Sequence, residues 1–504
     1  MEDVLIVGAG PVGLMLACEL SLAGIRPIVL EKRAEPSDLP KANGLGGQIV
    51  ELLDHRGLLE RFSAGSPFSG RAAGFPFAGV PLSFEGIDDI PLRLLLIQQP
   101  RLERLLTERA LELGVEIRRG YEARSLTQDE EGVTLEAGDS HLRVRYVVGC
   151  DGPRSGVREW AGIAFPGTTD EERLLIGHFK AEIKVFESLE GDGLQPGWNR
   201  TPNGRVLLTS LQDGVLIAGV TERSQTPEGE VTLADFHAAV RRVLDRDEDL
   251  PLGEPIWLSS TVAQARLAAR YRAGRVFVAG DAAHLFPAGG SALNVGMTDA
   301  VNLAWKLAGV LRGRASESLL NTYESERRPI GERTLMHSRA QAAIDGVEGE
   351  HGTALRELLA EVFAFPDPAR HLATLLHDSA LRYGPPGHPP TTSHGTPADP
   401  PTPYGSPDGL PGHPLVGRFV PDLALTGGGR VADLMHAARP VLLHLTDANE
   451  GPDDLTGGWV EVVRAHCDAP PADALLIRPD GYVAWAGTPG MPEAVSTWFT
   501  PDRP

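Results

Sequence analysis

The sequence of 504 residues predicts an α/β fold in which a parallel sheet is interrupted by an inserted antiparallel sheet and followed by a small separate domain. Three observations support this prediction. Residues 1–31 contain a strand, a glycine turn, a helix and a second strand. Residues 171–262 alternate apolar and polar side chains between turn signals, as antiparallel strands do. Residues 383–414 contain eleven prolines and six glycines, too many for regular core structure.

The parallel sheet begins with a βαβ unit, because the apolar run VLIVGA is followed by the helix pattern PVGLMLACELSLAG and the strand PIVLE. A second helix and strand pair is expected at 101–119, in RLERLLTERALELG and VEIRR. The segment LRVRYVVGCDG at 142–152 predicts a strand that ends in an Asp-Gly turn. These elements together predict a Rossmann-like domain.

The inserted sheet is predicted from segments such as HFKAEIKV at 178–185 and RVLLTSLQDGVLIAGV at 205–220. The strand GRVFVAGDAAH at 274–284 returns the chain to the first domain, and helix patterns fill 294–382. Residues 383–414 then form a linker over the surface, and the runs RPVLLHLTD and ADALLIRPDGYVAWAG indicate a small α/β domain after it.

Charge and cysteine content limit the function classes. The formal net charge is −21 and no basic tract is present, which argues against nucleic acid and anionic membranes as partners. The three cysteines are far apart and in no metal-like or redox-like spacing, which favours a reducing, cytoplasmic setting. We find no signal-peptide pattern and no apolar run near the roughly 20 residues of a membrane span. A soluble cytoplasmic protein with no metal site is expected.

The segment GAGPVG lies between the first strand and the first helix, where a dinucleotide fingerprint belongs. Gly8 permits a tight turn, Gly10 lets the backbone approach a pyrophosphate, and Gly13 allows the helix and strand to pack closely. The helix N-terminus, with Pro11 and Val12, would face the anion. Glu31 ends the second strand and can accept hydrogen bonds from an adenosine ribose.

Three separate segments together resemble the class A flavin monooxygenases, the group that includes para-hydroxybenzoate hydroxylase, phenol hydroxylase and the aromatic polyketide hydroxylases. They are GAGPVG with Glu31, CDGPRSGVR at 150–158, and GDAAHLFPAGG at 280–290 followed by NVGMTDAVNLAWKLA. The resemblance extends over nearly the whole chain. It implies an FAD-binding domain at 1–170, with part of the substrate domain near 73–98, and a substrate-binding sheet at 171–270. The chain would return to the FAD domain at 271–382. The linker at 383–414 and a thioredoxin-like domain at 415–504 would follow.

The resemblance implies that Asp281 hydrogen-bonds the ribityl chain of FAD, and that the loop from Pro287 to Leu293 passes beside the isoalloxazine ring. The helix that starts near Asn294 would direct its positive end at the ring. His284 is expected to order this loop and not to move protons. Further cofactor contacts implied in the same way are Lys32, Lys41, Gln48, Gln99, Arg101, Gly290, Ser291 and Ala292, and Asp151 and Arg154 are implied in NAD(P)H binding.

The chain departs from the family pattern in this loop. The family commonly has GGQGLN where this chain has GGSALN, so that Ala292 replaces a glycine, and the loop between His284 and Pro287 is one residue shorter. A methyl group at this position could crowd or shift the flavin. We therefore expect altered flavin mobility.

The resemblance implies that NADPH or NADH reduces FAD, that O2 adds at flavin C4a, and that the hydroperoxide transfers its distal oxygen to an aromatic ring. A phenolic substrate can activate itself by ionising, so no catalytic residue of the protein is assigned. The inserted sheet would exclude water from the site. The composition and the late domain resemble the polyketide-tailoring branch, which implies a polycyclic aromatic phenol as substrate. The alternatives are a Baeyer–Villiger oxygenation of a polyketide ketone and a non-catalytic flavoprotein in a biosynthetic assembly.

The late domain resembles the thioredoxin-like domain of phenol hydroxylase. It contains Cys467 but no CxxC, so dithiol chemistry is not expected. Its expected role is packing or the support of a homodimer. Deletion of residues 395–504 is then expected to lower stability or to change the oligomeric state, and to leave the flavin in any soluble remainder reducible.

Overall fold

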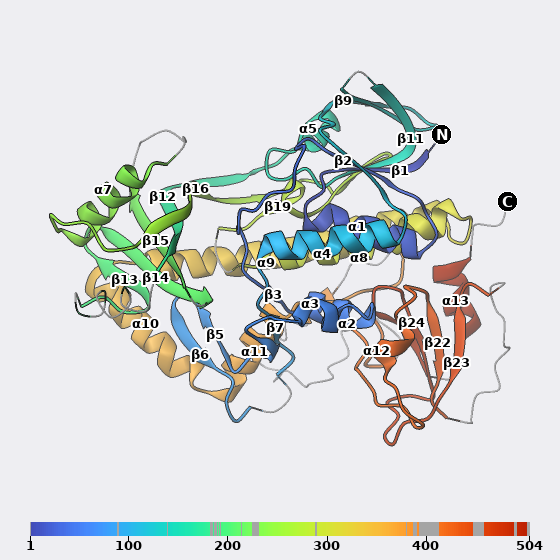
Figure 1. Cartoon of the computed structure of the whole chain (residues 1–504). Coiled ribbons are helices and arrows are strands. Elements are labelled where there is room, and N and C mark those ends of the chain that lie inside the picture. Colours follow the sequence, from blue (N-terminus) through green and yellow to red (C-terminus); the bar gives the residue numbers. More distant parts are fainter. Residues whose placement is uncertain are drawn as a thin grey trace.

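The computed structural model describes residues 2–87, 90–138, 140–181, 185, 189, 191, 193–212, 214–223, 231–287, 290–379, 381–386, 391–392, 413–446, 458–487 and 491–500. The mixed α/β fold predicted from the sequence is confirmed. The molecule is elongated, with an antiparallel sheet at one end and a small C-terminal domain near the other (Figure 1).

The first sheet has eight strands and carries the βαβ unit expected at the N-terminus. Its main path is β17-β18-β11-β1-β2-β8, in which β18, β11, β1, β2 and β8 run parallel. Strands β9 and β10 extend β11 as an antiparallel meander. The bounds are β1 Glu2–Val7, β2 Ile28–Glu31, β8 Glu116–Arg119, β9 Ala123–Gln128, β10 Val133–Ala137, β11 Ser140–Gly149, β17 Arg272–Ala273 and β18 Val276–Val278.

Three helices pack together beside this sheet: α1 (Pro11–Leu22), α4 (Gln99–Glu112) and α8 (Ala292–Leu311). Proline at the first or second position of α1 and α4 suits a helix start, because proline lacks the N–H that would be unpaired there. The contact between α1 and α8 is close. A Cβ placed on Gly296 would lie 2.8 Å from the Cα of Gly280 and 2.9 Å from a methyl group of Val12. The short helix α5 (Gly156–Trp160) follows β11.

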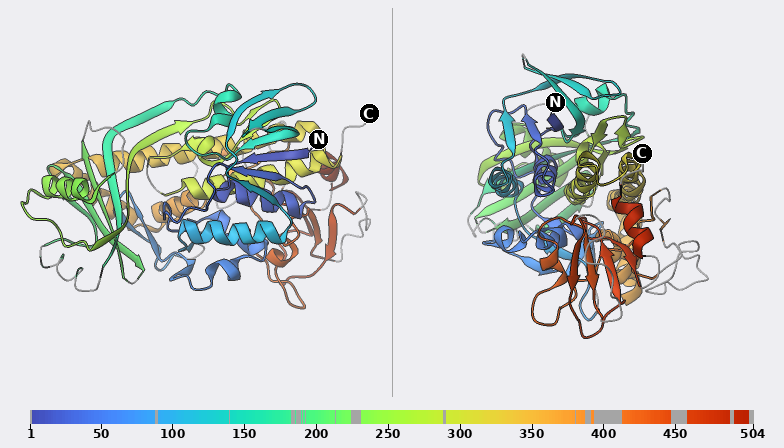
Figure 2. Two further views of the ribbon diagram at one scale, coloured as in Figure 1. Left: turned by 45° about the horizontal axis from the view of Figure 1, so that its top comes forward. Right: turned by 90° about the vertical axis from the view of Figure 1, so that its right-hand side faces the viewer.

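The second sheet has six antiparallel strands in the order β13-β14-β15-β12-β16-β19. Strands β12 and β16 are fourteen residues long and run as a pair from the first sheet to the second, as Figure 2 shows. Helix α7 (Leu233–Leu244) covers one face of this sheet, and a capping box between Thr232 and Asp235 fixes its start. The strand bounds are β12 Gly167–Lys180, β13 Gly197–Thr201, β14 Gly204–Gln212, β15 Val215–Arg223, β16 Glu254–Leu267 and β19 His284–Leu285.

Smaller elements lie between the two sheets and the C-terminal domain. A hairpin of β5 and β6 packs against α10 and α11, and a three-stranded sheet has the order β3-β7-β4. The bounds are β3 Leu45–Gly46, β4 Ser69–Arg71, β5 Gly74–Phe77, β6 Val80–Ser83, β7 Arg93–Leu95, α2 Gln48–His55, α3 Leu59–Ser63, α9 Asn321–Gly346, α10 Gly349–Phe363 and α11 Pro366–Leu376, with short 3-10 helices at Gly280–Ala282 and Glu317–Leu320 and short strands β20 Leu381–Arg382 and β21 Thr391–Thr392.

The C-terminal domain is a four-stranded mixed sheet with two helices. The strand order is β23-β22-β24-β25, in which β22 and β23 are parallel and the other pairs antiparallel. The bounds are α12 Val431–Leu434, β22 Val441–His444, β23 Glu461–Arg464, β24 Ala474–Ile477, β25 Val483–Ala486 and α13 Met491–Phe499. Its described cysteine, Cys467, is not in a disulfide.

Buried charges join this domain to α8 and α9. Glu326 accepts hydrogen bonds from Lys306, Asn302 and Arg478, and Arg478 also pairs with Asp480. All five side chains are fully or almost fully buried. Because buried ions must be paired, this network fixes how the two domains dock.

Three expectations need correction in detail. The strand expected over 274–284 is short, since β18 ends at Val278 and a 3-10 turn follows. The strand expected at 178–185 ends at Lys180, and residues 182–184 lie outside the described residues. The linker begins in the core and not at the surface, because Tyr383 is 2% exposed and stacks on Tyr482; residues 387–390 and 393–412 lie outside the described residues.

Candidate functional site

A cavity of about 800 Å³ opens where four parallel strands of the first sheet end. Strands β1, β2, β11 and β18 are followed by residues that line it, and α4 and α8 close it from the side. In open α/β sheets, ligands bind outside the carboxyl ends of strands. The predicted residues that line the cavity are Gly8, Gly10, Pro11, Val12, Glu31, Lys32, Lys41, Gln99, Asp151, Arg154, Asp281, Gly290, Ala292 and Leu293.

The glycine turn after β1 is shaped by two close backbone contacts and one open side. Gly8 has φ +107°, and a Cβ there would lie 2.3 Å from the carbonyl oxygen of Cys150. A Cβ on Gly13 would lie 2.0 Å from the carbonyl oxygen of Gly8. Around Gly10, by contrast, no atom of the described chain lies within 4 Å of an added Cβ. The turn thus presents bare backbone to the cavity at Gly10.

Glu31 holds the far side of this turn in place. Its Oε2 accepts the amide N–H of Ala9 at 2.9 Å, and its Oε1 accepts the amide N–H of Arg33 at 3.0 Å. Burial opposes ionisation of this carboxyl, but the amide hydrogen bonds and the Arg33 side chain outweigh it, so the pKa of Glu31 lies below its usual value. A charged carboxylate therefore sits at the end of β2, beside the cavity.

Helix α4 contributes a pair of side chains one turn apart. Gln99 donates from Nε2 to Oε1 of Glu103 at 2.8 Å, and both residues line the cavity. Arg101 lies on another side of the helix, where it donates to the carbonyl oxygen of Ala64. Burial raises the pKa of Glu103. The i, i+4 spacing from Gln99 could have identified Glu103 from the sequence.

Asp281 reaches the cavity from the short helix after β18. Its carboxylate makes no hydrogen bond to the described residues, and burial raises its pKa, although His284 and Lys41 act in the opposite direction. Because Asp281 is half-buried at the cavity and has no donor among the described residues, its carboxylate can accept hydrogen bonds from a ligand. Lys41 lines the same cavity.

The loop before α8 borders the cavity with Gly290, Ala292 and Leu293, while Ala288 and Gly289 lie outside the described residues. The Ser291 side chain does not cap the start of α8, and the backbone at Ala292 and Leu293 in the first turn borders the cavity. Pro287, Ser291 and Asn294 are half-buried and do not line the cavity. Asn294 instead accepts the amide N–H of Gly46 at 3.1 Å through Oδ1.

Gln48 also lies away from the cavity lining. It is 3% exposed, and its Oε1 accepts the hydroxyl of Tyr482 at 2.9 Å. Its Nε2 donates to the carbonyl oxygen of Asp378 at 3.4 Å. Gln48 is therefore bound between the C-terminal domain and the segment after α11.

In the Asp-Gly segment, Asp151 has a structural task in addition to lining the cavity. Its carboxylate accepts the hydroxyl of Ser155 at 2.5 Å and the amide N–H of Val157 at 3.1 Å, which stabilises the start of α5. Arg154 is exposed at the cavity edge. Arg158, not singled out from the sequence, donates to the carbonyl oxygen of Ala282 at 3.0 Å and so joins this segment to the loop of Asp281.

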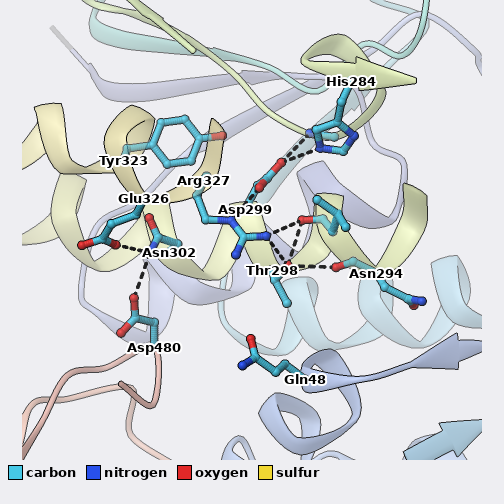
Figure 3. Close-up of polar contacts among 12 residues, drawn as sticks. Gln48, His284, Asn294, Thr298, Asp299, Asn302, Tyr323, Glu326, Arg327 and Asp480 are labelled. Atoms are coloured by element: carbon cyan, nitrogen blue, oxygen red, sulfur yellow. Dashed lines mark hydrogen bonds and ion pairs between the residues drawn. The ribbon is translucent and has the colours of Figure 1, made fainter. Parts of the chain in front are cut away.

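A buried polar network lies next to the loop of Asp281, and Figure 3 shows its contacts between His284, Asp299 and Arg327. Asp299 of α8 accepts the amide N–H of Gly280 at 3.2 Å, binds Nε2 of His284 at 2.9 Å and pairs with Arg327 of α9 at 2.7 Å. His284 is 0% exposed and stacks on Phe286 at 4.8 Å. The geometry fits an ordering role for His284. Asp299 and Arg327 were not found from the sequence, because nothing in their spacing marks them as partners.

The cavity residues fit FAD. Open backbone at Gly10 and an uncapped helix suit a pyrophosphate, the ionised Glu31 suits a ribose, and Asp281 suits hydroxyls of a ribityl chain. A family model described as an FAD binding domain matches residues 1–338, and one described as the C-terminal part of an aromatic-ring hydroxylase matches residues 413–501.

The chain belongs to the class A flavoprotein monooxygenases. The resemblance inferred from the sequence is thereby confirmed. The 12-dehydrotetracycline 5-monooxygenase/anhydrotetracycline 6-monooxygenase of Streptomyces rimosus subsp. rimosus is 40% identical over 533 residues, covering 99% of each chain. A dialkyldecalin synthase of Streptomyces rugosporus is 36% identical over 511 residues, also covering 99% of each. The crystal structure of an aromatic hydroxylase from angucycline biosynthesis covers 100% of both chains at 34% identity, with a TM-score of 0.85.

Among the described residues of this class A monooxygenase, no three or more His, Cys, Asp or Glu side chains are grouped so that they could hold a metal ion. Over the same part of the chain, no helix combines the length and apolar character needed to cross a membrane.

Proposed function

We propose that the chain uses FAD, NADPH or NADH, and O2 to hydroxylate a polycyclic aromatic phenol of the polyketide type. The observation that carries the proposal is the cavity at the strand ends, which brings the glycine turn, Glu31 and Asp281 to one place. The family of the chain supports the substrate class, as does its similarity, over 99% of its length, to the 12-dehydrotetracycline 5-monooxygenase/anhydrotetracycline 6-monooxygenase.

When bound, FAD supplies hydride acceptance and O2 activation. The protein positions the cofactor and places charged and polar groups around it. The turn at Gly10 would bind the pyrophosphate, Glu31 the adenosine ribose and Asp281 the ribityl chain. The start of α8 carries about half a positive charge and would stabilise negative charge on the ring by ~1 kcal/mol. The rest of the cavity lining includes Lys41, Gln99 and the segment of Asp151.

The substrate would lie on the side of the six-stranded sheet opposite α7. Alternate residues such as Leu175 and Val220 face α7, so their neighbours Ile176, His178 and Trp257 lie on the opposite face. Trp257 meets His178 edge to face at 5.5 Å between ring centroids. Apolar and aromatic side chains with one neutral polar group suit a flat phenolic ring system.

His178 would supply that polar contact. It is 2% exposed, and its Nε2 has no hydrogen-bond partner among the described residues. Burial lowers the pKa of His178, so the ring is neutral near pH 7 and can donate to or accept from a phenol.

The test is a reaction of the purified FAD-loaded protein with NADPH, ¹⁸O2 and a set of polycyclic phenols that includes anhydrotetracycline. A product that gains one ¹⁸O atom as a hydroxyl is expected. A product with ¹⁸O inserted between two carbons would favour a Baeyer–Villiger reaction. If no compound accelerates NADPH oxidation or gains ¹⁸O, hydroxylation of this substrate class is refuted.

The second candidate is a flavoprotein that does not oxygenate its substrate. The observation that favours it is the 36% identity to a dialkyldecalin synthase. Conversion of a substrate without consumption of NADPH or O2, in protein that retains FAD, would support this candidate.

A further inference from the structure

Tyr482 of the C-terminal domain makes a direct hydrogen bond to Gln48, the first residue of α2. It lies just before β25 and is 4% exposed. Its hydroxyl donates to Oε1 of Gln48 at 2.9 Å, although the two residues are 434 positions apart. Gln48 does not line the cavity, but Gly46, two residues earlier, is bonded to the first turn of α8, whose start does. A residue of the C-terminal domain thus contacts the segment that adjoins this edge of the candidate flavin site.

The segment that carries Gln48 is held between that contact and the start of α8. Gly46 donates its amide N–H to Asn294 in the first turn of α8, at 3.1 Å. Gly47 has φ +76°, and a Cβ there would lie 3.1 Å from the carbonyl oxygen of Leu376. Little space remains on that side, so a change in the position of Gln48 would be passed to Gly46 and to the helix start at the cavity.

A second route leads from Tyr482 to the loop of Asp281. The Tyr482 ring stacks on Tyr383, with centroids 4.0 Å apart. Nη1 of Arg327 donates to the Tyr383 hydroxyl at 2.9 Å, and Arg327 pairs with Asp299. Asp299 then accepts the amide N–H of Gly280, next to Asp281. Tyr482 is therefore connected both to the start of α8 and to the residue before Asp281.

Burial makes these contacts hard to replace. Gln48, Tyr383, Tyr482 and Arg327 are each at most 4% exposed. Because water does not reach these buried groups, it does not replace a hydrogen bond that is lost there. The Gln48 amide would then have to move to bond to another group.

We propose that Tyr482 is a positioning residue for the flavin site, which orients Gln48 and through it the segment beside the start of α8. The C-terminal domain then has a role beyond the packing expected from the sequence. The inference rests on FAD binding under the proposed function, and does not depend on which substrate is oxygenated.

The test compares Tyr482→Phe with Trp305→Phe. The first removes only the hydroxyl and keeps the ring that stacks on Tyr383. The second removes another buried interdomain hydrogen bond, from Nε1 of Trp305 to Asp480 at 3.1 Å, which does not reach Gln48. FAD affinity and the flavin absorption spectrum are measured on purified protein without substrate, together with the thermal midpoint.

We expect Tyr482→Phe to weaken FAD binding by about five-fold, the effect of one hydrogen bond, and to shift the flavin absorption bands. Trp305→Phe should lower the thermal midpoint and leave both flavin readouts unchanged. Gln48→Met should reproduce the flavin effects, and the double variant with Tyr482→Phe should weaken binding no further.

Two results would overturn the inference. One is a Tyr482→Phe protein whose FAD affinity and spectrum equal those of the wild type. The other is a double variant whose loss of affinity is the product of the single losses. If Tyr482→Phe cannot be obtained folded, Gln48→Met decides alone, because unchanged flavin readouts in that variant also contradict the inference. Absence of FAD binding in the wild type would instead refute the proposed function.

Discussion

The carboxylate of Asp299 pairs with the guanidinium of Arg327, with 2.7 Å between Oδ1 and Nε and side-chain exposures of 0% and 1%. Burial alone would raise the pKa of Asp299, but Arg327 and His284 outweigh it, and the pKa lies below its usual value. The pair joins α8 to α9 and, through the amide of Gly280, supports the loop that carries Asp281. A fixed ion pair therefore stands directly behind the candidate flavin site.

Asp299→Asn should destabilise the fold strongly, because it leaves the Arg327 charge buried without its counterion. A loss of about 3–5 kcal/mol in the free energy of unfolding is expected, measured by urea denaturation. The matched control is Glu332→Gln, which breaks the half-exposed pair of Arg328 and Glu332 in α9 and should cost less than about 1 kcal/mol. Equal losses in the two variants would contradict the structural role given to Asp299.

Gly10→Ala and Gly13→Ala should have different effects, although the two glycines belong to one fingerprint. Gly10 has φ −78° and open space around it, so alanine should fold normally and project into the cavity. We expect FAD affinity to fall about tenfold with little change in the thermal midpoint. An alanine at Gly13 meets backbone at 2.0 Å and should prevent folding. A Gly10→Ala protein with wild-type FAD affinity would show that no cofactor approaches this turn.

Asp281→Ala should affect the cofactor and not the protein scaffold. The carboxylate has no hydrogen bond to the described residues, and burial raises its pKa, so its removal costs the apoprotein nothing. Loss of a charged hydrogen bond should weaken FAD binding by about 10- to 100-fold. Equilibrium dialysis of FAD and thermal melting of the apoprotein separate the two effects. A lower apoprotein midpoint with unchanged FAD affinity would reverse this assignment.

Asp378 should make stability depend on pH between about 4 and 6. Burial raises the pKa of its carboxyl from 3.8 to about 6, against the influence of Arg327 and His377. The folded state therefore binds this proton more tightly than the unfolded state, and its contribution is present below pH 3.8 and lost as the pH rises through 6.

Asp378→Asn should abolish this loss, and asparagine tolerates the φ of +64° at this position. Relative to wild type, the variant should gain about 2–3 kcal/mol at pH 7 and nothing at pH 3.5. Urea denaturation at both pH values measures the difference. A difference between variant and wild type that does not change with pH would exclude Asp378 as the titrating group.

The sequence predicted the parts of the site that depend on neighbours in the chain. Gly8, Gly10 and Glu31 follow from the order of strand, turn, helix and strand, and the structure places all three at one cavity. Arg101 was also predicted to contact the cofactor, but it does not line the cavity. It lies two residues from Gln99, and this spacing turns it to another side of α4, while Glu103, four residues from Gln99, lines the cavity.

Contacts between distant segments could not be predicted in this way. Asp299, Arg327, Tyr383 and Tyr482 come from α8, α9, the start of the linker and the C-terminal domain, and no periodic pattern relates them. The composition of residues 383–414 predicted a linker over the surface, yet its first residue, Tyr383, lies in the core, where its ring stacks on Tyr482. Such partners are set by the packing of helices and domains.

The pairing of β12 with β16 has a consequence for engineering. Gly167 at the start of β12 is the register partner of Arg266 near the end of β16. The chain therefore enters and leaves the six-stranded sheet on two neighbouring strands. A segment with adjacent ends can be exchanged as a cassette, because a replacement of another length need not alter the distance between its attachment points. We expect an exchange of residues 173–262 for those of a related hydroxylase to change the substrate specificity and to leave the first sheet and its cavity unchanged.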